Sequence, residues 1–158
     1  MHQPRYQGIC NENIPSVELP NAGSVRVIAG EFRGAKGPAN TFSPIDLWDV
    51  RLKAGADAEF KIPKNHTTSV FVLRGEVSVS GGMSIGEAEI GVLDSEGDTF
   101  SLKASQDTVL LVLSGQPINE PIVGYGPFVM NTVEEIQQAF HDFQSGKMGA
   151  LEKVAGTE

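Results

Sequence analysis

The amino-acid sequence predicts an all-β fold: a jelly-roll barrel of about eight antiparallel strands, with an N-terminal arm and one C-terminal amphipathic helix. Its 158 residues suit a single domain with a substantial core. The 18 glycines and 9 prolines divide the chain into short segments. From residue 24 onward, segments of alternating apolar and polar residues recur about every 8–12 residues, a spacing typical of sandwiches and barrels.

The N-terminal residues 1–23 are polar and show no sustained strand or helix period. Pro4, Pro15 and Pro20 interrupt this stretch. We therefore expect an arm or linker before the barrel.

The barrel is expected to span residues 24–130. The clearest strand pattern lies in residues 46–55, where Trp48, Val50 and Leu52 alternate with charged side chains. Eight segments carry strand patterns: 24–30, 46–55, 57–62, 69–75, 76–80, 87–93, 98–104 and 107–115.

The pattern changes to a helical period after the barrel, and we expect a helix within residues 131–146. Thr132 followed by Glu135 is a capping-box signature, and Gly146 stands where a C-terminal cap belongs. The remaining residues, 147–158, are expected to form a flexible tail.

Composition excludes several classes of function. A net charge of −8 and a pI near 4.8 disfavour direct binding to nucleic acid or to anionic membranes. Cys10 is the single cysteine, so no internal disulfide forms. The sequence contains neither a signal-peptide pattern nor an apolar run long enough to span a membrane. We expect a cytoplasmic protein.

Eight short strands and a terminal helix are compatible with a cupin-type jelly roll, whose first motif places metal-ligating side chains between two glycines. Gly55 and Gly75 match these outer glycines. The ligand positions then fall on residues that are poor ligands for a transition metal: Lys61, Pro63 and Thr68, with Thr108 at the histidine position of the second motif.

His66 lies close to these positions but occupies none of them. We expect it to be a solvent-facing loop residue, because it follows the sequence Pro-Lys-Asn and a single imidazole does not make a stable metal site. The sequence thus predicts no catalytic, cofactor-binding or metal-binding residue. The glycine-rich stretch 30–38 could cradle an anion, but a connection between strands is favoured.

Three stretches resemble the C-terminal half of the pirins, which are members of the bicupin superfamily. They are "PRYQGI", "VRVIAGEFRGAKGPANTFSPIDLWDVRLKAGA" and, most specifically, "EPIVGYGPFVMNTVEEIQQAFHDFQSGKMG". The resemblance covers nearly the whole chain.

The resemblance implies several properties. Pirins have two cupin barrels, of which the N-terminal one holds an iron site with three histidines and one glutamate. The family is associated with quercetin 2,3-dioxygenase activity and with redox-dependent regulation of transcription factors. No iron is predicted in this chain, because iron would belong to the N-terminal domain of a full-length pirin.

A barrel that normally packs against a sister barrel has apolar surface to cover, and this predicts association. The expected partner is a second copy in a homodimer or a pirin N-terminal cupin domain, with a regulatory protein as a further possibility. Tyr125, Pro127, Phe128 and Met130 form a candidate interaction segment, although packing of the helix against the barrel is the favoured explanation.

Three functions stay open. The leading hypothesis is a noncatalytic pirin-like C-terminal cupin domain with a structural or protein-interaction role. The alternatives are a cupin that binds a small molecule without metal, and one part of a pirin-type quercetin 2,3-dioxygenase that needs a separate metal-bearing domain.

Overall fold

The computed structural model describes residues 5–80 and 82–150, and the chain divides into two compact units, Met1–Pro117 and Ile118–Glu158. This division falls before the β-hairpin at residues 123–130, which the sequence prediction had placed in the barrel. Most of the expected tail, residues 151–158, lies outside the described residues.

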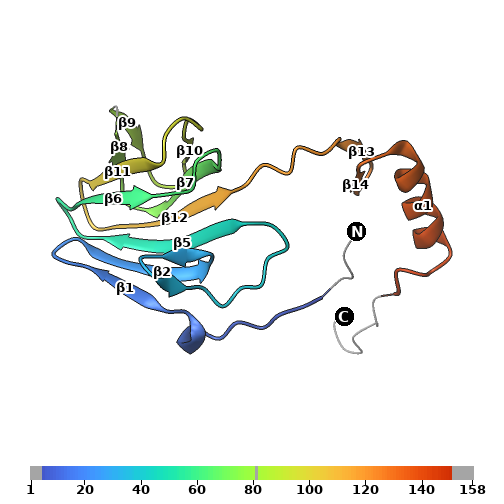
Figure 1. Cartoon of the computed structure of the whole chain (residues 1–158), viewed down its shortest axis with the longest axis horizontal. Coiled ribbons are helices and arrows are strands. Elements are labelled where there is room, and N and C mark those ends of the chain that lie inside the picture. Colours follow the sequence, from blue (N-terminus) through green and yellow to red (C-terminus); the bar gives the residue numbers. More distant parts are fainter. Residues whose placement is uncertain (1–4, 81, 151–158) are drawn as a thin grey trace, which may run out of the picture. The chain divides into compact units, whose positions relative to one another are not determined.

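The first unit is built from two antiparallel sheets (Figure 1). The larger sheet has the strand order β1-β2-β5-β12-β7-β10, and the smaller sheet has the order β6-β11-β8-β9. The strands are β1 (Ser16–Leu19), β2 (Gly23–Ala29), β5 (Ile45–Leu52), β6 (Asp57–Lys61), β7 (Thr67–Arg74), β8 (Val77–Val79), β9 (Met83–Ile85), β10 (Ile90–Val92), β11 (Thr99–Ala104) and β12 (Thr108–Gly115).

All eight predicted strands are present, and the all-β, cupin-type jelly-roll prediction is confirmed. Two strands of these two sheets, β1 and β9, were missed. One of them, β1, lies inside the expected arm and pairs with β2, with Val17 opposite Val25. It escaped detection because it is short and flanked by Pro15 and Pro20, which an edge strand tolerates at its ends.

The core lies between the two sheets and is centred on aromatic side chains. Trp48 of the larger sheet is fully buried and meets Phe32 edge-on, with ring centroids 5.0 Å apart. On the smaller sheet, Phe60 stacks on Phe100 at 5.4 Å. Edge-on and offset arrangements of this kind are favoured by the ring quadrupoles. The apolar members of the alternation seen in the sequence, Trp48, Val50 and Leu52, are therefore core residues.

A short hairpin joins β2 to β5. It consists of two antiparallel strands of two residues each, β3 (Glu31–Phe32) and β4 (Ala35–Lys36). The glycine-rich stretch 30–38 is thus a connection between strands, as the sequence favoured. A 3-10 helix, η1 (Asn11–Asn13), precedes β1.

The second unit contains the hairpin of β13 (Val123–Tyr125) and β14 (Phe128–Met130), followed by helix α1 (Val133–Gln144). The predicted capping box is present: the Thr132 hydroxyl accepts from the Glu135 N–H, and the Glu135 carboxylate accepts from the Thr132 N–H. Gly146 follows the helix with φ of 76°, as a C-terminal cap requires. Within the described residues, no helix is long and apolar enough to cross a membrane.

Candidate functional site

A row of polar side chains crosses the inner face of the larger sheet at one end. Strand register places Ser114 of β12 opposite Asp46 of β5 and opposite Thr68 of β7. All three side chains are buried. The Thr68 hydroxyl donates to Ser114 Oγ across 3.1 Å. Each of these positions is in phase with the core residues of its own strand, so the three polar side chains point inward. They mark the end of the apolar interior.

His66 joins this row and corrects one prediction. The sequence led us to expect a solvent-facing loop residue, but its exposed fraction is only 7%. The ring is held by a 3.1 Å hydrogen bond between Nδ1 and Ser114 Oγ. The loop before β7 turns inward because the His66 N–H bonds to the Pro63 carbonyl, which brings the imidazole against β12.

Asp46 is the charged member of the cluster. Its Oδ1 accepts a hydrogen bond from the Glu31 N–H at 3.2 Å, and its Oδ2 lies 3.9 Å from His66 Nδ1. Burial raises the pKa of Asp46. The Glu31 N–H and the nearby imidazole of His66 oppose that rise, and the negative charge of Glu31 adds to it.

Gly30 makes this arrangement sterically possible. It has a φ of 74°, in the left-handed region, and a Cβ built on it would lie 2.0 Å from Asp46 Oδ1. The chain can therefore pass next to the carboxylate and present the Glu31 N–H to it only if residue 30 has no side chain.

A cavity of about 550 Å³ adjoins the cluster. Asp46 and His66 form part of its wall, and the loop between β4 and β5 forms another part. The N-terminal segment holds that loop in place: Arg5 donates to the Asn40 carbonyl at 2.8 Å, and the Gln7 amide both accepts from the Asn40 N–H and donates to the Pro38 carbonyl. The volume of the cavity is that of a small-molecule site.

The cluster contains serine, histidine and aspartate, but it is not arranged as a catalytic triad. A triad needs the two imidazole nitrogens to face different partners, so that one takes the serine proton while the other is held by the carboxylate. Here Ser114 and Asp46 both approach Nδ1 of His66. The Ser114 hydroxyl is also buried and already bonded to Thr68. This geometry favours binding over nucleophilic chemistry.

The four cupin ligand positions do not converge on one point. Lys61 and Pro63 are exposed, whereas Thr68 and Thr108 are buried. Thr108 begins β12, and Thr68 of β7 pairs with Ser114 near the other end of β12. Thr108 and Ser114 are six positions apart along β12, which corresponds to roughly 20 Å. The side chains at these positions therefore do not fit an iron ion.

Among the described residues, no three His, Cys, Asp or Glu side chains are grouped so that they could hold a metal ion. His141 is exposed on α1 of the second unit, and Cys10 is exposed beside η1. Neither is placed with a catalytic partner.

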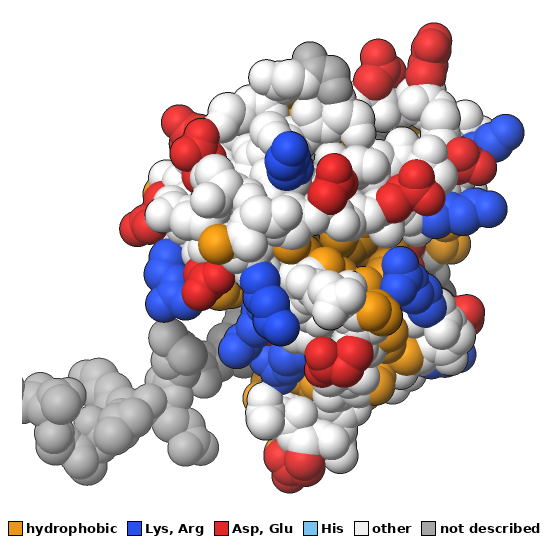
Figure 2. Space-filling model, turned by 90° about the vertical axis from the view of Figure 1, so that its left-hand side faces the viewer, with side chains coloured by type: hydrophobic (Ala, Val, Ile, Leu, Met, Phe, Trp, Pro, Cys, Tyr) orange, Lys and Arg blue, Asp and Glu red, His pale blue; other side chains and the backbone are white. Residues whose placement is uncertain are grey.

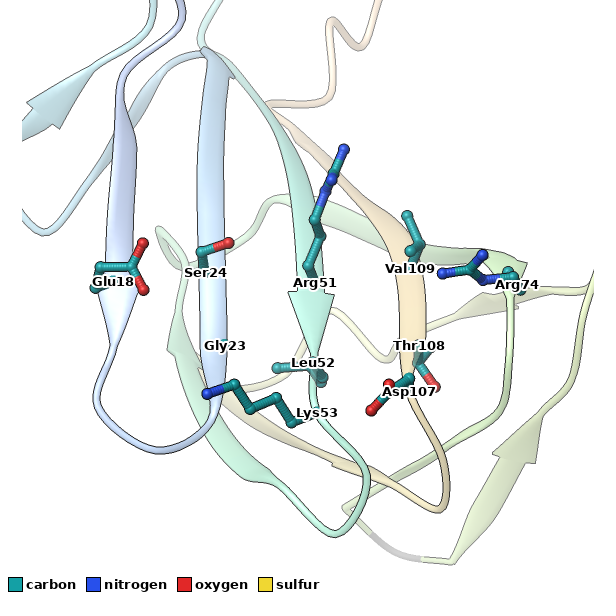
Figure 3. A pocket seen from close by; sticks show the side chains of 10 residues that line it. All are labelled: Glu18, Gly23, Ser24, Arg51, Leu52, Lys53, Arg74, Asp107, Thr108 and Val109. Atoms are coloured by element: carbon teal, nitrogen blue, oxygen red, sulfur yellow. The ribbon is translucent and has the colours of Figure 1, made fainter.

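A second, smaller cavity of about 300 Å³ lies at the other end of the larger sheet (Figure 3). Neighbouring strands contribute Glu18, Ser24 and Arg51, which register places side by side. Figure 2, which looks onto this end, shows basic side chains bordering an apolar area. Arg51 lies 3.6 Å from the carboxylate of Asp49, so part of its charge is already compensated.

The outer face of the larger sheet carries an apolar patch over β12, β7, β10 and the first half of β5, next to the charged Asp49 and Arg51 of β5. Register places Leu113 beside Leu47, and Leu111 beside Phe71, which in turn faces Ile90 of the edge strand. These side chains alternate with core residues and point away from the interior. The exposed fractions are 37% for Leu113, 60% for Ile90 and 65% for Val92. We call this surface, formed by Leu47, Phe71, Leu73, Ile90, Val92, Leu111 and Leu113, the outer apolar face.

The candidate interaction segment forms the β13–β14 hairpin of the second unit. Phe128 and Tyr125 pack edge-on against Phe140 of α1, at centroid distances of 5.0 and 5.5 Å. Pro127 is exposed and Met130 is half-buried. The segment therefore contacts its own helix, and a role in binding another protein stays a prediction.

Sequence reasoning missed Asp46, His66 and Ser114 as a group. A signal was present: Asp46, Thr68 and Ser114 are polar residues in the inward phase of three otherwise apolar strands. Their joint meaning depends on strand pairing, because His66 and Ser114 are 48 positions apart.

Comparison with known proteins places the chain in a family. The model of the pirin C-terminal cupin domain matches residues 47–149. A Pseudomonas aeruginosa protein named as a candidate quercetin 2,3-dioxygenase is 49% identical over 93% of this chain and 51% of its own length. Rat pirin is 36% identical over 94% of this chain and 52% of its own length.

Solved structures give the same result. The crystal structure of quercetin 2,3-dioxygenase from Acinetobacter baumannii superimposes with a TM-score of 0.88 at 47% identity, covering 94% of this chain and 52% of that chain. The chain thus spans about half the length of the relatives it matches. It belongs to the pirin family, and the part it contains is the pirin C-terminal cupin domain.

Proposed function

We propose that this chain is a noncatalytic cupin domain whose outer apolar face docks against a second, metal-bearing cupin barrel. The observation that carries the proposal is the outer apolar face itself. Soluble proteins rarely leave a contiguous apolar sheet surface exposed, and such surfaces mark interaction sites. In the first unit, Ile90 and Val92 are its most exposed members and lie on the edge strand β10.

The partner that docks on the outer apolar face follows from the length of the relatives. Each relative contains a further stretch about as long as this chain, because the match covers only about half of it. The family resemblance implies that this stretch is a cupin barrel with an iron site. A barrel of that kind, rather than a second copy of this chain, is the proposed partner.

The ligand positions support a noncatalytic role for this half. Lys61 carries a positive charge that repels a metal, Pro63 has no donor atom in its side chain, and Thr68 is engaged with Ser114. The quercetin 2,3-dioxygenase activity named for relatives would therefore require the partner barrel to supply the metal and its ligands.

Docking is tested by mixing the chain with the separately produced N-terminal half of the Acinetobacter baumannii relative in sedimentation velocity experiments. An equimolar complex is expected. The double variant Ile90→Glu/Val92→Glu places two charges in the interface and should weaken association at least tenfold, equivalent to about 1.4 kcal/mol.

The matched control is Ile118→Glu/Ile122→Glu, which makes the same kind of change at two exposed apolar residues of the second unit. It should leave the association unchanged. Self-association of the chain in place of the mixed complex would establish a homodimer instead, and a monomer under all conditions would show that the face does not dock.

The noncatalytic role is tested separately. Protein purified without chelator should contain no stoichiometric iron and should consume no oxygen with quercetin. Stoichiometric iron in this chain alone would overturn the argument from the ligand positions.

A further inference from the structure

We infer that the cavity beside Asp46 and His66 binds a small organic cation, with its ammonium group held by the carboxylates of Asp46 and Glu31. This site is independent of the outer apolar face, because it opens at the polar end of the sheet interior. Its remaining lining is made largely of glycine, proline and loop residues, which leave the floor of the cavity to the polar cluster.

The charges that line the cavity favour a cation. Glu31 and Asp46 bring two carboxylates, against the single ammonium of Lys36, and the imidazole of His66 adds a positive charge only when protonated. The net charge of −8 on the whole chain also concentrates cations near its surface.

Asp46 lacks a strong positive partner. Its Oδ1 accepts from the Glu31 N–H, but its Oδ2 lies 3.9 Å from the imidazole, beyond hydrogen-bond reach. Within residues 5–80 and 82–150, no Lys or Arg forms an ion pair with it. A nearly buried carboxylate without such a partner is unfavourable, and a bound ammonium would supply one.

His66 adds a second recognition group. Its Nδ1 is engaged with Ser114, whereas its Nε2 has no hydrogen-bond partner among the described residues. The ring lines the cavity and is more than nine-tenths buried. The free nitrogen is therefore available to a polar atom of the ligand, at a position that the Ser114 bond fixes.

A metal ion is a poorer occupant than an organic cation. Asp46, Glu31 and His66 are not grouped within ligating distance of a common point, since no set of three such side chains in the described residues is. A volume of about 550 Å³ also suits an organic molecule better than a bare ion.

Hydrogen bonds within the chain brace the wall of the cavity. Three hydrogen bonds join Arg5 and Gln7 to Pro38 and Asn40, and Gly30 allows the Glu31 N–H to approach Asp46. A preorganised site loses less ordering entropy when it binds.

Isothermal titration calorimetry with three probes of similar length tests the inference: 1,4-diaminobutane, the neutral 1,4-butanediol and the anionic succinate. The diamine should bind saturably, the diol at least tenfold more weakly, and succinate not at all. Asp46→Asn should weaken diamine binding at least tenfold, whereas Glu87→Gln, which removes an exposed carboxylate elsewhere, should not change it.

Two results would overturn the inference. One is equal affinity for the diol and the diamine, and the other is unchanged diamine binding in Asp46→Asn. If Asp46→Asn does not fold, Glu31→Gln carries the same test, because Glu31 is exposed and its replacement does not disturb the core. Diamine binding that Glu31→Gln leaves unchanged would then count against the site.

Discussion

Both faces of the larger sheet carry a group of apolar side chains, yet the two groups stand in opposite situations. On β12, Leu110 points inward and is fully buried, whereas Leu113 points outward and is 37% exposed. The inner face has a partner in the smaller sheet. Within the described residues of the first unit, the outer apolar face is left partly exposed, although its side chains are of the same type. Hydrophobic patterning therefore identifies which faces need a partner, but only the structure shows which face already has one.

The largest expected change in stability compares the same substitution on the two faces. Leu110→Ala removes a fully buried side chain and should lower the free energy of unfolding by about 2–5 kcal/mol. Leu113→Ala, the same change on the outer face, should lower it by less than about 1 kcal/mol. Urea denaturation measures both. Equal losses would mean that the outer face is packed in the isolated chain.

A smaller effect is expected at the polar end of the inner face. Ser114→Ala leaves His66 Nδ1 and Thr68 Oγ1 buried without their shared partner, and should lower the unfolding free energy by about 1–3 kcal/mol. Ser69→Ala is the control, because Ser69 lies on the outer face opposite Leu113. A negligible change in Ser114→Ala would show that water replaces the lost bonds.

Asp46→Asn tests the electrostatics of the same end. The pKa of Asp46 is raised by burial, so the folded state favours the protonated form. This contribution to stability is fully present below the ordinary pKa of 3.8 and is lost as the pH rises through the raised value. The wild-type protein should therefore gain stability relative to Asp46→Asn as the pH falls through that window. Parallel pH profiles from chemical denaturation would contradict the prediction.

The smallest effect is expected on the stability of the outer face variant. Ile90→Glu/Val92→Glu should change the unfolding free energy of the isolated chain by no more than about 0.5 kcal/mol per substitution, because both side chains are largely exposed. Thermal unfolding of the chain alone provides the measurement. A large loss of stability would make the docking experiment uninformative about recognition and would place these residues in the core.

Much of the fold was predictable from local pattern. The alternation in residues 46–55 and the capping box at Thr132 each depend on neighbours in sequence, and both predictions are confirmed. Short elements were harder. The hairpin of β13 and β14 has strands of three residues around Gly126 and Pro127, too short for a period to emerge.

The candidate site was less predictable, for a physical reason. The exposure of His66 depends on Ser114 and Asp46, which reach it only after three strands have paired in register. The hydrophilic sequence around His66 is typical of an exposed loop, and nothing local distinguishes a histidine that turns inward. The absence of good ligands at Lys61 and Pro63, in contrast, could be inferred by counting alone.

The close approach of Gly30 to Asp46 links the evolution of two positions that are far apart in the chain. A Cβ at residue 30 would collide with the carboxylate of Asp46 and also with the Ile45 carbonyl, at 2.7 Å, so Asp46→Gly should only partly relieve the effect of Gly30→Ala. The two substitutions together should then be less harmful than the sum of their separate effects. Among relatives, a residue other than glycine at position 30 would accordingly signal that the backbone around residues 30 and 45, and with it the cation site, is arranged differently.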